Sequence, residues 1–297
     1  MSTGNERFND EAADWDKNPS VQESSRLAFN ALSPLIESLS AQKQHQHAAT
    51  GAPVETAAGL LHVLEAGCGT GLLTVRVAPL VGSIVAIDPA QGMIEALKAK
   101  IGSSTSTCKS DNKSADGPRS PTTTTTTTTV TANNEKKKKK NNVSNILPIC
   151  HLLTNPEDPI LPPEEERRDD DGSGRQRRRR KFDLIISHLV MHHVPDLRSF
   201  LETLFGCLAP GGRVALTDFE DFGPEAIKFH PPMKMDGVER HGIPRVWMEG
   251  LMREVGFCDV DVSVRWRLRK SVELWEGQRL GDTMEFPFLL CEGVRPA

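Results

Sequence analysis

Short runs of aliphatic and β-branched residues recur along this chain, and longer stretches with apolar residues at helical spacing lie between them. In Ser20–Leu39, for example, the apolar residues follow a period close to 3.6, as in an amphipathic helix. The pattern predicts strands at 63–66, 83–88, 145–153, 182–188, 213–218, 259–264 and 286–294, and helices at 20–39, from 72, 89–100, 196–208 and 244–255. Because strands and helices alternate, we expect a largely parallel sheet with helices on both faces.

Two low-complexity stretches interrupt this alternation. Gly102–Asn142 contains eight consecutive threonines and five consecutive lysines, and Glu164–Arg180 is a charged stretch without apolar residues. Neither stretch can form an apolar face, so we expect both to be disordered insertions. The polar stretch Ala41–Gly59 is interpreted as a solvated linker. We therefore expect one domain over residues 1–297, with an N-terminal helical lid and linker at 1–59.

The region that contains the two insertions has more basic than acidic residues, unlike the rest of the chain. Ser103–Lys181 holds 16 Lys and Arg against 11 Asp and Glu, whereas the whole chain holds 36 against 40. The remainder is therefore acidic, which is the wrong sign for binding phosphates. A basic run such as Arg177–Lys181 is compatible with a contact to nucleic acid or with a nuclear import signal. Because basic runs on such segments are promiscuous, we expect a solvated surface and no nucleic-acid partner.

The cysteines and the apolar runs indicate the cellular compartment in which the protein is expected. The six cysteines lie far apart without a C-x-x-C pair, which indicates free thiols in a reducing compartment. No apolar run approaches the ~18 residues of a membrane span, and the N-terminus is acidic and polar, unlike a secretory signal. We therefore expect a cytoplasmic protein without a membrane partner. The sequence does not indicate an oligomeric state.

The stretch Val63–Gly71 carries the strongest chemical pattern in the chain. A buried strand passes Glu65 and ends in a loop with glycine at every second position, at Gly67, Gly69 and Gly71. Glycine accepts the positive φ angles of a tight turn and lets the backbone approach a ligand closely. The helix that follows directs free N–H groups at that ligand. The loop therefore predicts a nucleotide site, although its spacing differs from the dinucleotide pattern G-x-G-x-x-G.

A second acid supports this interpretation. The short apolar strand Ser83–Asp88 ends in an acid, and one carboxylate can accept hydrogen bonds from both hydroxyls of a ribose. Glu-x-Gly-x-Gly-x-Gly followed by this acid resembles motif I and the next strand of the class I S-adenosylmethionine-dependent methyltransferases. The turn Leu208–Gly212 resembles the Leu-x-Pro-Gly-Gly turn before their fifth strand. The resemblance covers most of the chain outside the two insertions.

The resemblance implies a fold and a cofactor. The fold is an α/β, Rossmann-like, doubly wound and mostly parallel seven-stranded sheet in three layers, with an antiparallel final strand at Phe286–Val294. The cofactor is S-adenosylmethionine, with its methionine part on the glycine loop and its ribose on Asp88. The cofactor-binding residues implied are Glu65, Gly67, Cys68, Gly69, Gly71, Asp88, Pro89, Met93, Leu153 and Ser187.

Two further features of the family are compared residue by residue. An acid that meets the adenine after the third strand has no counterpart at that strand tip here, and Asn155, Glu157 and Asp158 are its candidate substitutes. Phe8–Asp16 resembles an aromatic, acid-flanked lead-in that packs over the cofactor pocket. The alternative is that this segment only docks an N-terminal helix on the core.

Histidines are the candidate bases, because their ordinary pKa lies near neutrality. His188 follows the fourth strand, near the expected sulfonium. His241 lies in the long connection Phe219–Gly242, which we interpret as the wall of the acceptor pocket. For the pair His192–His193 we expect backbone hydrogen bonds and no metal, because a pair without a matching third ligand is a poor metal signal.

The sequence therefore predicts a methyltransferase that transfers a methyl group to a small-molecule acceptor by in-line displacement. Such an enzyme must hold donor and acceptor at near-attack distance and exclude water. Two alternatives stay open. One is an RNA or protein methyltransferase that uses the basic insertions, and the other is a non-catalytic cofactor-binding partner subunit.

Overall fold

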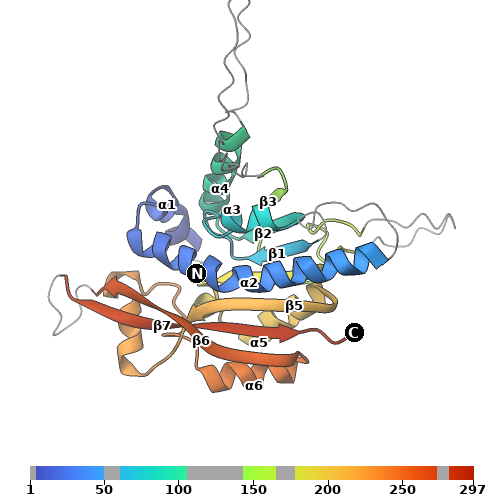
Figure 1. The fold of residues 1–297 in the computed structure, drawn as a ribbon. Coiled ribbons are helices and arrows are strands. Elements are labelled where there is room, and N and C mark those ends of the chain that lie inside the picture. Colours follow the sequence, from blue (N-terminus) through green and yellow to red (C-terminus); the bar gives the residue numbers. More distant parts are fainter. Residues whose placement is uncertain (1–4, 50–60, 106–142, 165–177, 273–280) are drawn as a thin grey trace, which may run out of the picture.

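The computed structural model describes residues 5–49, 61–105, 143–164, 178–272 and 281–297. Seven strands form one sheet in the order β3-β2-β1-β4-β5-β7-β6 (Figure 1). The strands are β1 (His62–Ala66), β2 (Ser83–Asp88), β3 (Ile146–Cys150), β4 (Phe182–His188), β5 (Leu208–Phe219), β6 (Cys258–Ser271) and β7 (Thr283–Val294). Neighbours from β3 to β5 pair in parallel, and β7 pairs antiparallel with β5 and β6. The predicted fold class, with an antiparallel final strand, is confirmed.

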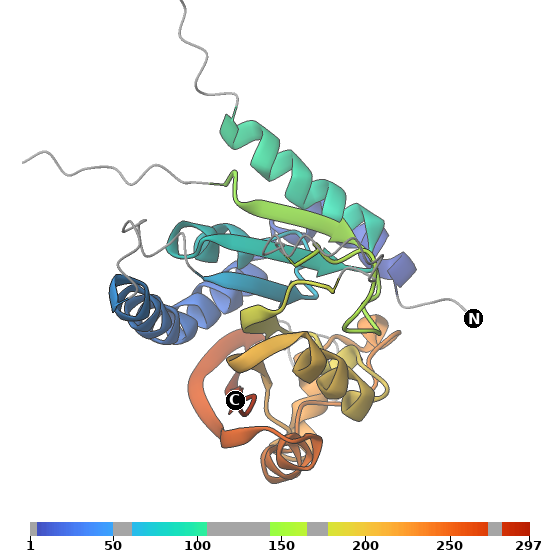
Figure 2. The same ribbon diagram turned by 90° about the vertical axis from the view of Figure 1, so that its right-hand side faces the viewer.

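Helices cover both faces of this sheet (Figure 2). The helices are α1 (Asn5–Trp15), α2 (Pro19–Ala49), α3 (Thr74–Val77), α4 (Gln91–Thr105), α5 (Leu197–Cys207) and α6 (Arg245–Val255), with short 3-10 helices η2 (Ala78–Leu80), η4 (Met191–His193), η5 (Pro224–Phe229) and η6 (Pro232–Lys234). Ile36 of α2 and Leu97 of α4 share a core cluster with Val63. Leu201 of α5 shares the opposite cluster with Leu64. Because neighbouring strand residues face opposite sides, β1 feeds both cores and the fold has three layers.

The polar segment after Leu39 is helical as far as the structure describes it. α2 continues to Ala49, and residues 50–60 lie outside the described part of the chain. The prediction of a solvated linker was therefore wrong for Ala41–Ala49. Glutamine and lysine are good helix formers, and neither glycine nor proline interrupts the segment. Lys43 Nζ lies 2.5 Å from Asp183 Oδ1, which fastens this extension to the sheet.

The predicted insertions are described only at their edges. α4 runs to Thr105, so the first insertion does not begin at Gly102 as predicted. Residues 106–142 and 165–177 lie outside the described residues, and so does the prediction of disorder there. The helix predicted from Leu72 is a single turn, α3, that continues as η2. Among the described helices, none is both long and apolar enough to cross a bilayer.

β6 and β7 extend farther than the alternating pattern predicted. They pair from Cys258 with Val294 to Ser271 with Thr283, whereas the predicted strands were 259–264 and 286–294. In the extension of β6 the buried Leu268 packs into a cluster with aromatic rings, and Arg267 beside it is exposed. This aromatic cluster consists of Phe219, Phe229, Leu268, Val272, Phe286 and Phe288. Arg265, Arg267 and Arg269 are exposed and therefore occupy the solvent side of a long strand.

Candidate active site

A cavity of about 510 Å³ lies at the carboxyl ends of the first four strands. Ala66, Asp88, His151 and His188, which end or follow β1, β2, β3 and β4, all line it. Ligands of open α/β sheets bind at this edge, and the volume falls in the range of about 300–1,000 Å³ typical of small-molecule pockets. The cavity is therefore the candidate site.

The three loop glycines have distinct steric roles. Gly67, Gly69 and Gly71 have φ angles of +74°, +52° and +80°. A Cβ on Gly67 would meet Val190 Cγ2 at 2.2 Å, and one on Gly71 would meet Leu97 Cδ1 at 2.3 Å. Among the described residues, no atom lies within 4 Å of a Cβ built on Gly69. Gly67 and Gly71 therefore permit close packing of the loop, whereas Gly69 leaves open space beside the cavity that it lines.

Asp88 ties the loop to the end of β2. Its Oδ2 accepts a hydrogen bond from Gly69 N at 2.9 Å, and its Oδ1 accepts one from Ala90 N at 2.8 Å. Burial raises the pKa of Asp88, and these two backbone donors oppose that shift. Each carboxylate oxygen can accept more than one hydrogen bond, so the side chain keeps acceptor capacity toward the cavity.

Glu65 is a buried carboxyl group at the cavity wall. Burial raises its pKa to about 8, the nearby Asp88 charge adds to the shift, and the Thr74 hydroxyl opposes it. Glu65 is therefore protonated at neutral pH. Among the described residues its Oε2 has no hydrogen-bond partner. A buried polar atom without a partner is unfavourable, so this position suits a ligand that brings a donor or a positive charge.

The N-terminal helix closes one side of the cavity. Phe8 and Trp15 of α1 line the cavity and contact each other edge to face, with ring centroids 5.9 Å apart. Beyond the helix, Asp16 accepts a hydrogen bond from the Thr70 hydroxyl at 2.6 Å and lies 2.6 Å from Lys100 Nζ. Phe8–Asp16 therefore covers the cavity as well as docking on the fold, so the alternative of docking alone does not hold.

His188 lines the cavity with both ring nitrogens engaged. Thr217 donates its hydroxyl proton to Ser187 O at 3.0 Å, so it accepts a hydrogen bond from His188 Nδ1 at 2.9 Å. His188 Nε2 then accepts from the buried Ser24 hydroxyl at 3.0 Å. Burial is the main cause that lowers the pKa of His188 to about 4. The ring is therefore a neutral, fixed wall of the site.

The structure brings most of the predicted residues to the cavity. Its lining includes Glu65, Gly67, Cys68, Gly69, Asp88, Pro89, Met93, Leu153 and His188. Gly71, Ser187 and His241 are not among the lining residues. Ser187 instead donates its hydroxyl to Ala66 O at 2.8 Å, which ties β4 to the end of β1. Asn155, Glu157 and Asp158 also do not line the cavity, although Asp158 Oδ2 lies 2.8 Å from Nε2 of the lining His151.

Sequence reasoning missed His193 as a residue of the cavity wall. Its Nδ1 lies 2.6 Å from Gly237 O, which is a backbone hydrogen bond of the kind expected. Burial lowers the pKa of His193 to about 3. The sequence signal was its position just after the fourth strand, at the edge where ligands bind.

A protein-family model described as a methyltransferase domain matches residues 25–276. The chain belongs to this family. The family match confirms the resemblance to class I methyltransferases, and the protein is an enzyme whose cofactor is S-adenosylmethionine. A comparison with curated protein sequences finds no match.

Solved structures are similar to this chain at low sequence identity. A candidate methyltransferase from Bacillus halodurans C-125 is 14% identical, with a TM-score of 0.51 over 84% of this chain and 97% of that chain. The N-methyltransferase NodS from Bradyrhizobium japonicum WM9 is 14% identical, with a TM-score of 0.40 over 80% and 86%. A chain from the complex of the Haloferax volcanii Trm112 methyltransferase activator with its candidate methyltransferase is 13% identical, with a TM-score of 0.45 over 98% of both chains.

Proposed function

We propose that this methyltransferase acts on a small-molecule acceptor, to which it transfers the methyl group by in-line displacement. The observation that carries the proposal is the makeup of the cavity wall. Its described lining residues include no lysine or arginine, and Phe8, Leu152, Val194 and Phe200 give it apolar surface. A site that holds RNA relies on cations against phosphates. The small volume and the apolar wall favour a compact, weakly charged acceptor.

In this proposal the glycine loop and the strand-end acids hold the cofactor, which supplies an electrophilic methyl group on a sulfonium. Gly69 would leave room for its methionine part, and Asp88 would accept hydrogen bonds from its ribose hydroxyls. A bound cation would lower the pKa of Glu65, and the carboxyl group would then release its proton to solvent. Pro89, Met93 and Leu153 add apolar wall. Burial raises the pKa of Cys68, so its thiol acts as a small neutral group.

The histidines at the cavity position the reactants and do not act as bases near neutral pH. A general base works best with a pKa near the working pH, whereas those of His188 and His193 lie near 4 and 3. The predicted base His241 is not among the described cavity-lining residues. The chain therefore contributes proximity and water exclusion, which suits an acceptor atom that is nucleophilic without a base.

The cofactor part of the proposal is tested by calorimetry with S-adenosylmethionine. Asp88→Ala removes two charge-assisted hydrogen bonds to the ribose, so we expect about a 100-fold loss of affinity. Asp88→Asn retains one acceptor and should lose less. Glu37→Ala, an exposed position on α2, is the matched control and should bind like the unaltered protein. Unchanged affinity in Asp88→Ala would remove Asp88 from the site.

The acceptor part is tested by supplying methyl-labelled cofactor with either a small-molecule extract or an RNA and protein fraction. We expect the label in the small-molecule fraction, with a turnover nearly independent of salt. A macromolecular acceptor held through phosphates would lose affinity by orders of magnitude between about 50 and 200 mM salt. Label recovered in RNA or protein would overturn the proposed acceptor class and leave the cofactor site intact.

A further inference from the structure

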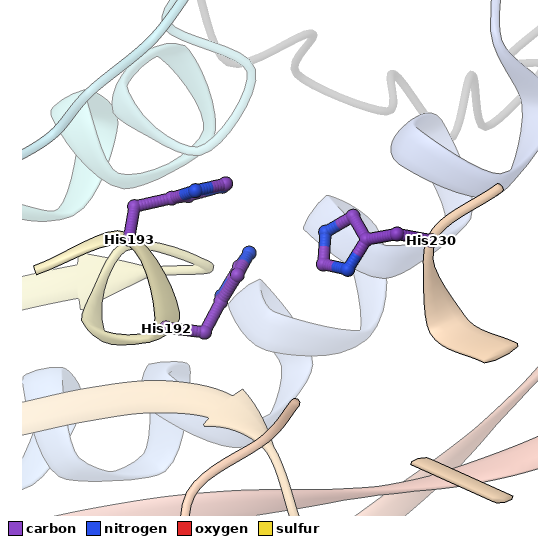
Figure 3. Close-up of side chains that lie close together, drawn as sticks. All are labelled: His192, His193 and His230. Carbon is purple, nitrogen blue, oxygen red and sulfur yellow. The ribbon is translucent and has the colours of Figure 1, made fainter. Parts of the chain in front are cut away.

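Three histidines from two distant segments converge beside the cavity (Figure 3). His192 and His193 belong to η4, and His230 follows η5. One nitrogen atom from each ring lies within 4.8 Å of the other two. His192 is 1% exposed and His230 is 9% exposed. The sequence offered only a pair without a third ligand, and the fold supplies that third ring.

The His192 ring is oriented by a buried carboxylate. Its Nδ1 lies 2.8 Å and 3.0 Å from the two oxygens of Asp218, which is fully buried. A carboxylate accepts hydrogen bonds, so Nδ1 carries the proton and Nε2 carries a lone pair. Among the described residues this Nε2 has no hydrogen-bond partner. A buried lone pair without a donor is unfavourable unless another group, such as a metal ion, takes it.

The His193 ring has the same arrangement with a backbone partner. Its Nδ1 donates to Gly237 O, so its Nε2 also carries a lone pair. In metal sites a histidine ligand commonly donates its other ring N–H to a carboxylate or a backbone carbonyl, which fixes the ring and its tautomer. Arg240 fixes the turn itself, because it donates to Met191 O at 2.5 Å and to Val194 O at 2.6 Å.

We propose that His192, His193 and His230 bind a divalent transition-metal ion of the zinc type, with Asp218 and Gly237 O orienting the first two rings. Neutral imidazoles suit zinc and its neighbours, and three protein ligands leave a fourth position open. His193 also lines the cavity, so that position lies next to the proposed acceptor site. The proposal does not depend on the identity of the acceptor.

The geometry and the local charges set what binding requires. Zinc–nitrogen bonds of about 2.0–2.1 Å place tetrahedral ligand atoms about 3.4 Å apart, so the rings must draw closer by up to about 1.4 Å. His193 is less buried than His192 and His230, so its ring has the most room to move. The buried Asp218 carboxylate, bonded to His192 Nδ1, supplies a negative charge close to the proposed ion.

The test is metal binding by the full-length, tag-free protein after dialysis against a chelator. Titration with Zn²⁺ should show one ion per chain with a dissociation constant in the micromolar range or below, and Co²⁺ should give the visible absorption of a four-coordinate site. His193→Gln and His230→Gln should each weaken Zn²⁺ binding by at least about tenfold. His45→Gln, an exposed histidine on α2, is the matched control and should bind as the unaltered protein does.

Cofactor affinity and a second glutamine variant separate loss of the metal site from loss of folding. Affinity for S-adenosylmethionine should stay unchanged in His230→Gln, which shows that the variant is folded. His193→Gln supplies the second variant if His230→Gln does not fold. The proposal is overturned if the unaltered protein takes up no stoichiometric Zn²⁺, or if Zn²⁺ binds equally well to both glutamine variants. Loss of Zn²⁺ in His45→Gln would also overturn it, because the ion would then sit on α2.

Discussion

The two ends of the cavity are built in different ways. The cofactor end comes from one continuous stretch, Glu65 to Asp88, in which backbone groups and two acids surround open space at Gly69. The histidine end gathers side chains from η4, the end of β5 and the loop after η5, and Asp218 and Gly237 O orient two of its rings. A site built mainly from the backbone of one segment can be predicted from a local sequence pattern. A site made of convergent side chains becomes visible only in the fold.

The largest expected effect lies at the histidine end. In protein freed of metal, His192→Ala should lower the free energy of unfolding by about 3–5 kcal/mol, because the buried ring leaves a cavity and the Asp218 carboxylate loses its side-chain donor. The backbone N–H groups of His192 and Phe219 still donate to Asp218. His193→Ala, whose ring bonds only to a backbone carbonyl, should lower it by about 1 kcal/mol. Equilibrium urea unfolding measures both. Equal losses would show that the carboxylate does not depend on His192.

At the cofactor end the next largest effect is a pH dependence. The folded-state pKa of Glu65, about 8, lies above its ordinary value of 4.5, so the folded protein holds a proton that the unfolded chain has released. Stability should therefore fall as pH rises from about 5 to 8, by on the order of 3 kcal/mol. Glu65→Gln should remove this slope in urea titrations at the two pH values. Parallel slopes for both proteins would contradict the assignment.

A pair of glycine substitutions separates packing from binding. Gly67→Ala should destabilise the protein by about 2–3 kcal/mol, because a positive φ angle and a clash with Val190 add together. Gly69→Ala meets no neighbour and should lose only about 1 kcal/mol. Its methyl group enters the open space, so cofactor affinity should still fall clearly. Thermal unfolding and calorimetry together check the pair, and a Gly69→Ala protein with full affinity would argue against the proposed loop contact.

The smallest expected effect concerns the lid. Asp16→Asn weakens the links to Thr70 and Lys100, so cofactor affinity should fall about fivefold with little change in melting temperature. Asp14→Asn is the control, since Asp14 pairs only with Lys17 at the surface and such pairs contribute little. Calorimetry measures both variants. The same affinity in both would mean that closure of α1 does not support cofactor binding.

The sequence predicted the sheet and the cofactor end because both rest on local patterns. Runs of buried residues gave the seven strands, and the glycine spacing with Asp88 gave the loop that lines the cavity. The errors lie where local chemistry was ambiguous. Polar residues after Leu39 resemble a linker, yet they are good helix formers. The strand predicted at 259–264 was too short, because exposed arginines continue the alternation to Ser271 on the solvent face of β6.

The histidine end was predicted only in part. His188 was placed correctly at the cavity, but its bonds to Ser24 and Thr217 come from α2 and β5, far along the chain. The meeting of His192 and His193 with His230 depends on how the connection after β5 folds back over η4. Periodicity in the sequence predicts helices and strands, but it does not predict a contact between two such distant segments.

One strand sets the positions of groups throughout the histidine end. β5 presents Thr217 to His188 and, at the next residue, Asp218 to His192. It is hydrogen bonded along both edges, to β4 and to β7, so it cannot slide without breaking two ladders. An added or deleted residue inside β5 would turn both side chains to the opposite faces of the sheet. The chain can therefore gain length between its strands, but the residue count of β5 has to stay fixed for the site to exist.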